Sequence, residues 1–178
     1  MLKRFIPFAY EKAIFDIDIM DLSSLGIKTI LTDLDNTLIT YDDSTPTPKV
    51  KELKRKLDEA GIKIIICSNN KGKRVSRFSN LLGVEYESFL RKPFSGPLKK
   101  MIKRKGLNKK ETIIIGDQIM TDVLCGNASK IRVILTEPLG KKEPPWTKVN
   151  RLFDKPIRKR MLKKGLLKSL KEKINGEI

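Results

Sequence analysis

The chain has 178 residues, 39% of them hydrophobic, which is enough for one domain with a buried core. Its 38 Lys and Arg residues outnumber its 21 Asp and Glu residues, and the formal charge of +17 favours anionic partners: phosphorylated metabolites, nucleic acids or acidic lipid surfaces. Histidine is absent, which excludes an imidazole base, a histidine metal ligand and a Ser-His-Asp triad.

The cysteines and the apolar runs bear on where the protein is found. Cys67 and Cys125 lack the spacing of a zinc site, and so few cysteines in a chain without an apparent signal peptide indicate a reducing cytoplasm. No apolar run approaches the roughly 20 residues of a membrane-spanning helix. We therefore expect a cytoplasmic protein, either free or associated with the cytoplasmic face of a membrane.

Residues 1–26 are predicted to form an N-terminal extension that precedes the core. Its apolar residues Phe5, Ile6 and Phe8 lie next to a basic pair. These apolar residues either cover an edge of the sheet or join a membrane-facing surface.

Apolar runs that alternate with charged, helix-like segments predict the fold. Near-continuous runs of Ile, Val and Leu are typical of parallel strands covered on both faces, and they occupy 27–33, 62–68, 84–86, 112–116 and 131–137. Three of the helical segments between them, 49–61, 73–83 and 96–106, each end in a glycine. This order predicts the α/β class, with a single doubly wound parallel sheet of about five core strands.

Polar side chains lie at or soon after the ends of four of the predicted strands. They are Asp33 and Asp35, then Ser68 and Asn69, then Lys92, and finally Asp117. Each alone is an ordinary helix cap or solvated turn. Because ligands of open parallel sheets bind beyond the carboxyl ends of the strands, their joint occurrence predicts one shared site.

Four of these segments resemble the motifs of haloacid dehalogenase (HAD) superfamily phosphatases: DLDNTL (33–38), Ser68-Asn69, Lys92-Pro93 and GDQIMTD (116–122). The run GDQIMTDVLCGN and the earlier IFDI are similar to the YqeG-like branch of subclass IIIA, which is related to mitochondrial phosphatidylglycerophosphate phosphatases. The resemblance implies a single HAD-like domain over 1–178, with a Rossmann-like core at about 27–136. It also implies a Mg²⁺-dependent phosphomonoester hydrolase.

The resemblance gives the reacting residues their roles. Asp33 would be the nucleophile that forms an aspartyl-phosphate, and Asp35 would protonate the leaving oxygen and then activate water. Ser68, with the amide of Asn69, would hold the phosphoryl oxygens, and Lys92 would balance their charge.

Magnesium is the cofactor that the resemblance implies. Its ligands would be the carboxylates of Asp33 and Asp117 and the main-chain carbonyl of Asp35, since Mg²⁺ prefers oxygen. Asp122 would not bind the ion directly but would hold Lys92 or a water molecule bound to the ion. Thr37 would lie at the substrate, where it shapes the loop rather than reacts.

Two short intervals predict that no cap domain covers the site. Only residues 40–47 separate the first motif from the next helix, and the interval from Ser68 to Lys92 has room for one helix and one strand. An open site would accept a large or surface-held phosphoester as well as a small one.

The C-terminal extension, 150–178, is predicted to be a basic amphipathic helix. Leu162, Leu166, Leu170 and Ile174 recur every four residues among many Lys and Arg residues. Such a helix either makes peripheral contact with an anionic membrane or packs its stripe against the protein's own sheet.

The expected partner is a phosphorylated small molecule or a phospholipid head group, with phosphatidylglycerophosphate preferred. One alternative is a phosphatase of a phosphorylated nucleotide, sugar or nucleic-acid end. Another is a non-catalytic basic RNA- or ribosome-binding module on a HAD scaffold. Nucleic acid is the less favoured partner, because the chain has only seven Phe, three Tyr and one Trp and no basic-aromatic stacking motif. The sequence carries no signal for an oligomeric state.

Overall fold

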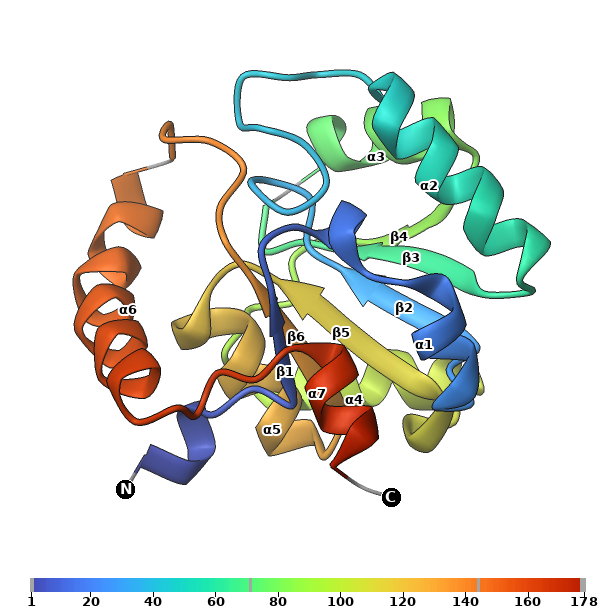
Figure 1. Ribbon diagram of the computed structural model, residues 1–178. Coiled ribbons are helices and arrows are strands. Elements are labelled where there is room, and N and C mark those ends of the chain that lie inside the picture. Colours follow the sequence, from blue (N-terminus) through green and yellow to red (C-terminus); the bar gives the residue numbers. More distant parts are fainter. Residues whose placement is uncertain (1, 71, 144, 177–178) are drawn as a thin grey trace.

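Six parallel strands form one sheet in the computed structural model, which describes residues 2–70, 72–143 and 145–176 (Figure 1). The strand order is β1-β6-β5-β2-β3-β4. The strands are β1 (Ala9–Glu11), β2 (Thr29–Thr32), β3 (Lys63–Cys67), β4 (Glu85–Glu87), β5 (Thr112–Gly116) and β6 (Arg132–Thr136). All five predicted strands are present, and the predicted doubly wound α/β fold is confirmed.

The sixth strand, β1, comes from the segment that was predicted to be an extension outside the core. It pairs with β6 in parallel, with Ala9 opposite Ile134. Residues 9–11 include no Ile, Val or Leu, so the apolar runs that predicted the other strands do not mark this segment. Phe8 packs against one core cluster, and Phe5 and Ile6 pack against the other. The N-terminal residues therefore cover the edge of the sheet.

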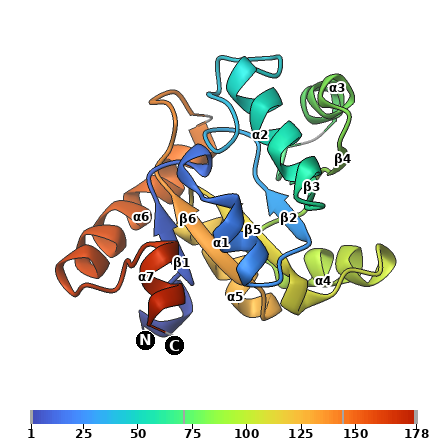
Figure 2. The same cartoon turned by 45° about the vertical axis from the view of Figure 1, so that its right-hand side comes forward.

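Successive strand residues point to opposite faces of the sheet and bury two separate cores. Ile30 and Ile115 belong to one core, whereas Leu31 and Ile114 belong to the other. Apolar side chains of four helices line the first core: α1 (Ile19–Ser24), α2 (Pro48–Glu59), α3 (Lys73–Leu82) and α7 (Leu170–Asn175). Side chains from α4 (Ser95–Arg104), α5 (Leu124–Ser129), the π-helical turn η4 (Ile119–Val123) and the end of α6 (Pro145–Lys163) line the second core. Figure 2 shows α4, α5 and α6 from a second direction.

Local signals in the sequence account for where the helices begin and end. α2 starts at Pro48, and the Thr47 hydroxyl accepts a hydrogen bond from the Val50 amide, 3.4 Å away. α3 ends at Gly83, whose φ of +70° is the left-handed conformation that glycine adopts without strain. Three short 3₁₀ turns, η1 (Leu2–Phe5), η2 (Ile14–Asp16) and η3 (Lys109–Glu111), complete the structure.

The prediction of one continuous C-terminal helix is wrong. The segment forms two helices, because α6 ends at Lys163 next to Gly165, which has a φ of +62°, and α7 begins only at Leu170. Leu170 is buried and Leu166 packs against a core, so most of the predicted apolar stripe covers the protein itself. None of the described helices is long and apolar enough to cross a membrane.

The strand order reverses between β2 and β5, which are neighbours in the sheet. From β2 the chain winds through β3 and β4 on one side, then crosses back to β5 and β6 on the other. Thr32 lies opposite both Ile66 and Ile115, so the three strands end at nearly the same level. A crevice at such a reversal is where doubly wound sheets bind their ligands.

Candidate active site

The residues that follow β2, β3 and β4 converge on one pocket at the carboxyl edge of the sheet. Its volume is about 480 Å³, including space open to solvent. It is lined by Asp33, Asp35, Asn36, Ser68, Asn69, Asn70, Lys92, Gln118, Thr121, Thr147 and Asn150. Five of the predicted site residues are thus brought together, namely Asp33, Asp35, Ser68, Asn69 and Lys92.

Lys92 is the fixed cation of this pocket. Its Nζ donates hydrogen bonds to Asp33 Oδ1 at 2.9 Å, to Asp122 Oδ1 at 2.6 Å and to the Cys67 carbonyl at 2.9 Å. Burial alone would lower the pKa of Lys92, but the charges of Asp122 and Asp33 outweigh it and raise that pKa above its usual value. Lys92 therefore stays protonated, with Asp122 as its second carboxylate.

Asp33 lies at the floor of the pocket with 12% of its side chain exposed. Burial raises the pKa of its carboxyl group to about 7, and the charge of Lys92 opposes that rise. The neighbouring carboxylates of Asp122, Asp117 and Asp35 raise it further. The ionised form of Asp33 therefore needs more positive charge than Lys92 supplies.

Asp35 is held by two residues that sequence reasoning missed. Its Oδ2 accepts a hydrogen bond from Asn70 Nδ2 at 2.6 Å, and its Oδ1 accepts one from Arg74 Nε at 2.9 Å. Arg74 lies in the first turn of α3, four residues after Asn70, but basic residues are too frequent in this chain for its position to stand out.

Asn69 connects the second motif to the third. Its side-chain oxygen accepts a hydrogen bond from the Lys92 amide at 2.7 Å, and its side-chain nitrogen donates one to the Lys92 carbonyl at 2.8 Å. The preceding Ser68 is buried, and its hydroxyl accepts a hydrogen bond from the Asn70 amide at 3.1 Å. Together these bonds fix the backbone from which Lys92 reaches the floor.

Asp117 does not line the pocket but lies beneath it, fully buried. Its Oδ1 accepts a hydrogen bond from the Thr37 hydroxyl at 3.2 Å, and its Oδ2 pairs with the Arg151 guanidinium. Burial raises the pKa of the Asp117 carboxyl group to about 6, while Arg151 opposes that rise. Thr37 therefore holds this carboxylate, and Thr37 is not among the residues that line the pocket.

The glycine of the fourth motif makes room for Asp122. A Cβ atom at Gly116 would lie 2.3 Å from Asp122 Cγ, which is far inside van der Waals contact. Position 116 must therefore be glycine, which has no Cβ atom, for Asp122 to reach Lys92.

The C-terminal segment supplies one wall of the site, which the sequence did not indicate. Thr147 and Asn150 of α6 line the pocket. Arg151 donates to the Asp117 carbonyl at 2.8 Å and to Glu143 at 2.6 Å. Asp154 accepts the amides of Ile119 and Met120, both at 3.0 Å. These contacts fix α6 to the loop and turn that follow β5.

The donor chemistry of the site suits a magnesium ion. Four carboxylates of the site form ion pairs with only three cationic side chains. Lys92 pairs with both Asp33 and Asp122, Arg74 pairs with Asp35, and Arg151 pairs with Asp117. Among the described residues, no three acidic or thiol side chains converge tightly enough to hold an ion by themselves. The ligand set implied by the family resemblance has two carboxylates and one carbonyl, so oxygen donors and unbalanced negative charge favour a hard divalent cation.

The two thiols are expected to be inert. Burial raises the pKa of Cys67 to about 12 and that of Cys125 to about 11, so neither forms a thiolate near neutral pH. Iodoacetamide should leave both thiols unlabelled in the folded protein, as judged by mass spectrometry, and should leave hydrolysis of p-nitrophenyl phosphate unchanged. Guanidinium-unfolded protein, in which both label, is the control. Labelling of the native protein with loss of turnover would contradict this expectation.

Comparisons with known proteins find relatives of similar sequence and a solved structure of similar fold. A model of the haloacid dehalogenase-like hydrolase family matches residues 2–136. The "Probable phosphatase YqeG" of Bacillus subtilis (strain 168) is 37% identical over 166 residues, which cover 93% of this chain and 96% of the relative. The "Phosphatidylglycerophosphate phosphatase 1, chloroplastic/mitochondrial" of Arabidopsis thaliana is 28% identical over 171 residues.

The Arabidopsis relative is longer than this chain, and a solved structure shares the fold of this chain. The alignment with the Arabidopsis protein covers 90% of this chain but 49% of that relative, so the chain spans about half its length. A solved structure of an uncharacterized protein from Listeria monocytogenes serotype 4b superposes with a TM-score of 0.53 at 14% identity. It covers 75% of this chain and 99% of its own, and the likeness shows the fold.

Proposed function

The chain belongs to the haloacid dehalogenase-like hydrolase family, and we propose that this phosphatase hydrolyses phosphomonoesters with Mg²⁺ through an aspartyl-phosphate on Asp33. One observation carries the proposal: Asp33 lies on the pocket floor, hydrogen-bonded to Lys92, in a group of carboxylates with too few cations. A dianionic phosphoryl group can approach such a carboxylate only where positive charge is held in place.

In the first half of the reaction, a carboxylate oxygen of Asp33 attacks phosphorus as the bond from phosphorus to the leaving oxygen breaks. Asp35 gives its proton to that leaving oxygen, so an alcohol departs and Asp35 becomes a carboxylate. Lys92 stays charged and neutralises the phosphoryl oxygens. The Ser68 hydroxyl and the main-chain amide of Asn69 hold these oxygens in line for attack.

In the second half, the Asp35 carboxylate takes a proton from water as the water oxygen attacks the phosphorus of the aspartyl-phosphate. The bond between phosphorus and the Asp33 oxygen breaks, which regenerates the Asp33 carboxylate and releases inorganic phosphate. Asn70 and Arg74 hold Asp35 where both proton transfers can take place.

Asp33, Asp117 and the main-chain carbonyl of Asp35 would hold the magnesium ion. When bound, it supplies the positive charge that lets an anionic nucleophile meet an anionic phosphoryl group. Thr37 and Arg151 orient Asp117 for that role through its two carboxylate oxygens.

Removal of divalent metal is expected to abolish turnover. Purified protein should hydrolyse p-nitrophenyl phosphate with Mg²⁺, lose activity in EDTA and regain it with excess Mg²⁺. Because the carboxylates outnumber their cations, Mg²⁺ should also raise the unfolding temperature, by mass action on the folded state. Full turnover in EDTA, with no thermal shift on adding Mg²⁺, would refute the metal assignment.

We propose a phospholipid head group, with phosphatidylglycerophosphate preferred, as the substrate. The support is the likeness to the Arabidopsis phosphatase, a formal charge of +17 and the absence of an inserted cap among the described residues. A phosphorylated sugar or nucleotide is the alternative with the same chemistry. A screen of phosphatidylglycerophosphate beside soluble phosphoesters, compared by kcat/KM, separates them. The non-catalytic binding module is not retained, since the chain is a phosphatase.

A lipid substrate requires the protein to work at a bilayer surface. We therefore place it in the cytoplasm, in peripheral contact with the membrane face whose lipids it dephosphorylates. The broken apolar stripe of the tail is unsuited to this contact, because Leu166 and Leu170 pack against the protein.

A further inference from the structure

A patch of large apolar side chains lies exposed on the first half of α6. Val149 is 55% exposed, Leu152 71% and Phe153 56%. Because residues three and four positions apart share one face of a helix, these three side chains form one continuous patch. We call the patch, with the basic residues around it, the α6 surface. Adjacent large apolar side chains in solvent mark a site of interaction.

The charge of the α6 surface has one sign. Its exposed charged residues are Lys148, Lys155, Lys159, Arg160 and Lys163, and no described acidic side chain forms a salt bridge with any of them. The one acidic residue of α6, Asp154, is buried and accepts the amides of η4. An apolar patch within a purely cationic surround is complementary to a surface that is anionic outside and apolar beneath.

The opposite side of α6 forms part of the active site. Thr147 and Asn150 line the pocket, and Arg151 is paired with Asp117. α6 stands at the left of Figure 1, on the side toward which the arrows of β2 and β5 point. One helix therefore carries the pocket wall on one side and the exposed patch on the other.

We propose that the α6 surface docks on an anionic lipid bilayer and holds the pocket at the level of the lipid head groups. The apolar side chains would enter the boundary of the acyl region, while the lysines extend to the phosphates. A protein partner is the less suitable occupant, because lysine is depleted at protein interfaces. An RNA partner would favour several stacking aromatic side chains, and the patch has only one, Phe153, beside the aliphatic Val149 and Leu152. This docking rests on the proposed lipid substrate but is tested without it.

The test is flotation with vesicles of phosphatidylcholine, with or without phosphatidylglycerol. Wild-type protein should float with the anionic vesicles and not with the neutral ones. The double variant Lys155→Gln/Lys159→Gln should lower the partition coefficient about 30-fold. Leu152→Gln/Phe153→Gln should lower it at least about tenfold. Turnover of p-nitrophenyl phosphate without vesicles should be unchanged in both.

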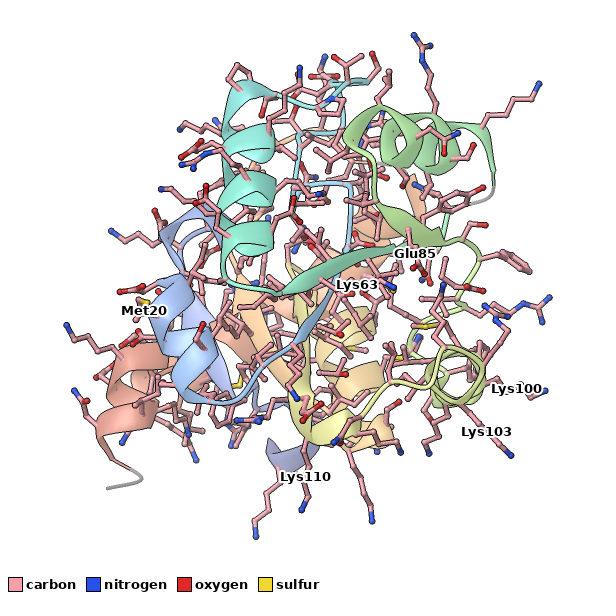
Figure 3. All side chains as sticks on the ribbon, turned by 90° about the vertical axis from the view of Figure 1, so that its right-hand side faces the viewer. Met20, Lys63, Glu85, Lys100, Lys103 and Lys110 are labelled. Carbon is pink, nitrogen blue, oxygen red and sulfur yellow. The ribbon has the colours of Figure 1, made fainter. Side chains whose placement is uncertain are left out.

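Matched controls come from the other side of the molecule, which Figure 3 faces. Lys100 and Lys103 project from α4 there, and Met20, 74% exposed, projects from α1. Lys100→Gln/Lys103→Gln and Met20→Gln should float as wild type does. If these controls lost as much binding to the anionic vesicles as the α6 variants, the net charge of the whole protein would account for the binding. That result would overturn the proposal that the α6 surface docks on the bilayer.

Two further outcomes would also overturn the proposal. One is a wild-type protein that floats with neither vesicle. The other is wild-type protein that binds single-stranded RNA through α6 but no vesicle, which would make nucleic acid the occupant. Neither bears on the proposed function, which fails separately if wild-type protein does not hydrolyse p-nitrophenyl phosphate with Mg²⁺.

Discussion

Replacing Asp33 with asparagine is expected to lower phosphomonoester turnover by about 10⁴-fold or more. The amide cannot form the aspartyl-phosphate, and no other carboxylate lines the pocket at its floor beside Lys92 among the described residues. Steady-state hydrolysis of p-nitrophenyl phosphate measures the loss. Trapping of a phosphorylated protein by acid quench should succeed with wild type and fail with the variant.

The fold should survive this change. The pKa of Asp33 is raised from 3.8 to about 7, so its cost to stability is absent below pH 3.8 and grows as the pH rises towards 7. At pH 8 in EDTA, Asp33→Asn should therefore unfold at the same temperature as wild type or at a higher one. In the variant, the buried ammonium group of Lys92 still has the carboxylate of Asp122 as its ionic partner.

Asp42→Asn is the matched control for the nucleophile. Asp42 lies on the loop that follows the same motif, and its carboxylate pairs only at the surface, with Lys142 at 3.1 Å. It should keep wild-type turnover. An Asp33→Asn protein that still turns over substrate, or still becomes phosphorylated, would remove Asp33 from the nucleophile's role.

Removing the charge of Lys92 should be the most destabilising single substitution in the site. Lys92→Met keeps the length of the side chain but leaves Asp33 and Asp122 without their shared cation, at side-chain exposures of 12% and 1%. Breaking a buried ion pair from one side costs about 3–5 kcal/mol of the free energy of unfolding. Urea denaturation at neutral pH measures this cost, and turnover should be lost with it.

A second substitution tests whether the loss of stability comes from the buried carboxylate of Asp122, which Lys92→Met leaves without a cation. Lys92→Met combined with Asp122→Asn should be less destabilised than Lys92→Met alone, because the buried charge is then removed as well. Lys28→Met is the surface control, since Lys28 pairs with Glu111 at side-chain exposures of 69% and 36% and should cost under about 1 kcal/mol. If Lys92→Met costs no more than Lys28→Met, the buried network is not stabilising.

The convergence of the candidate site residues at one edge of the sheet was predictable because each of their segments has a local signature. Asp33, Ser68 and Asp117 each follow an apolar strand directly, and parallel strands of one sheet bring their carboxyl ends to one edge. The pairing of Lys92 with Asp122 also agrees with the role that the resemblance implied.

The residues that support these groups had no such signature. Asn70 and Arg74 hold Asp35, yet each looks like an ordinary polar residue at the start of a helix. Arg151 is one of many basic residues in the tail, and only packing shows that it reaches Asp117, 34 positions away. Asn36 reaches further still, accepting the amide of Gly140, 104 positions away.

By itself, the sequence determined the class of fold, five of the six strands and the edge at which the candidate site lies, since apolar runs and the residues that follow each strand are local properties. Only the tertiary structure decided that β1 completes the sheet, that the tail breaks at Gly165, and that α6 forms a wall of the pocket. These features depend on contacts between distant segments, whose free energy is set by burial and charge pairing after the chain has folded.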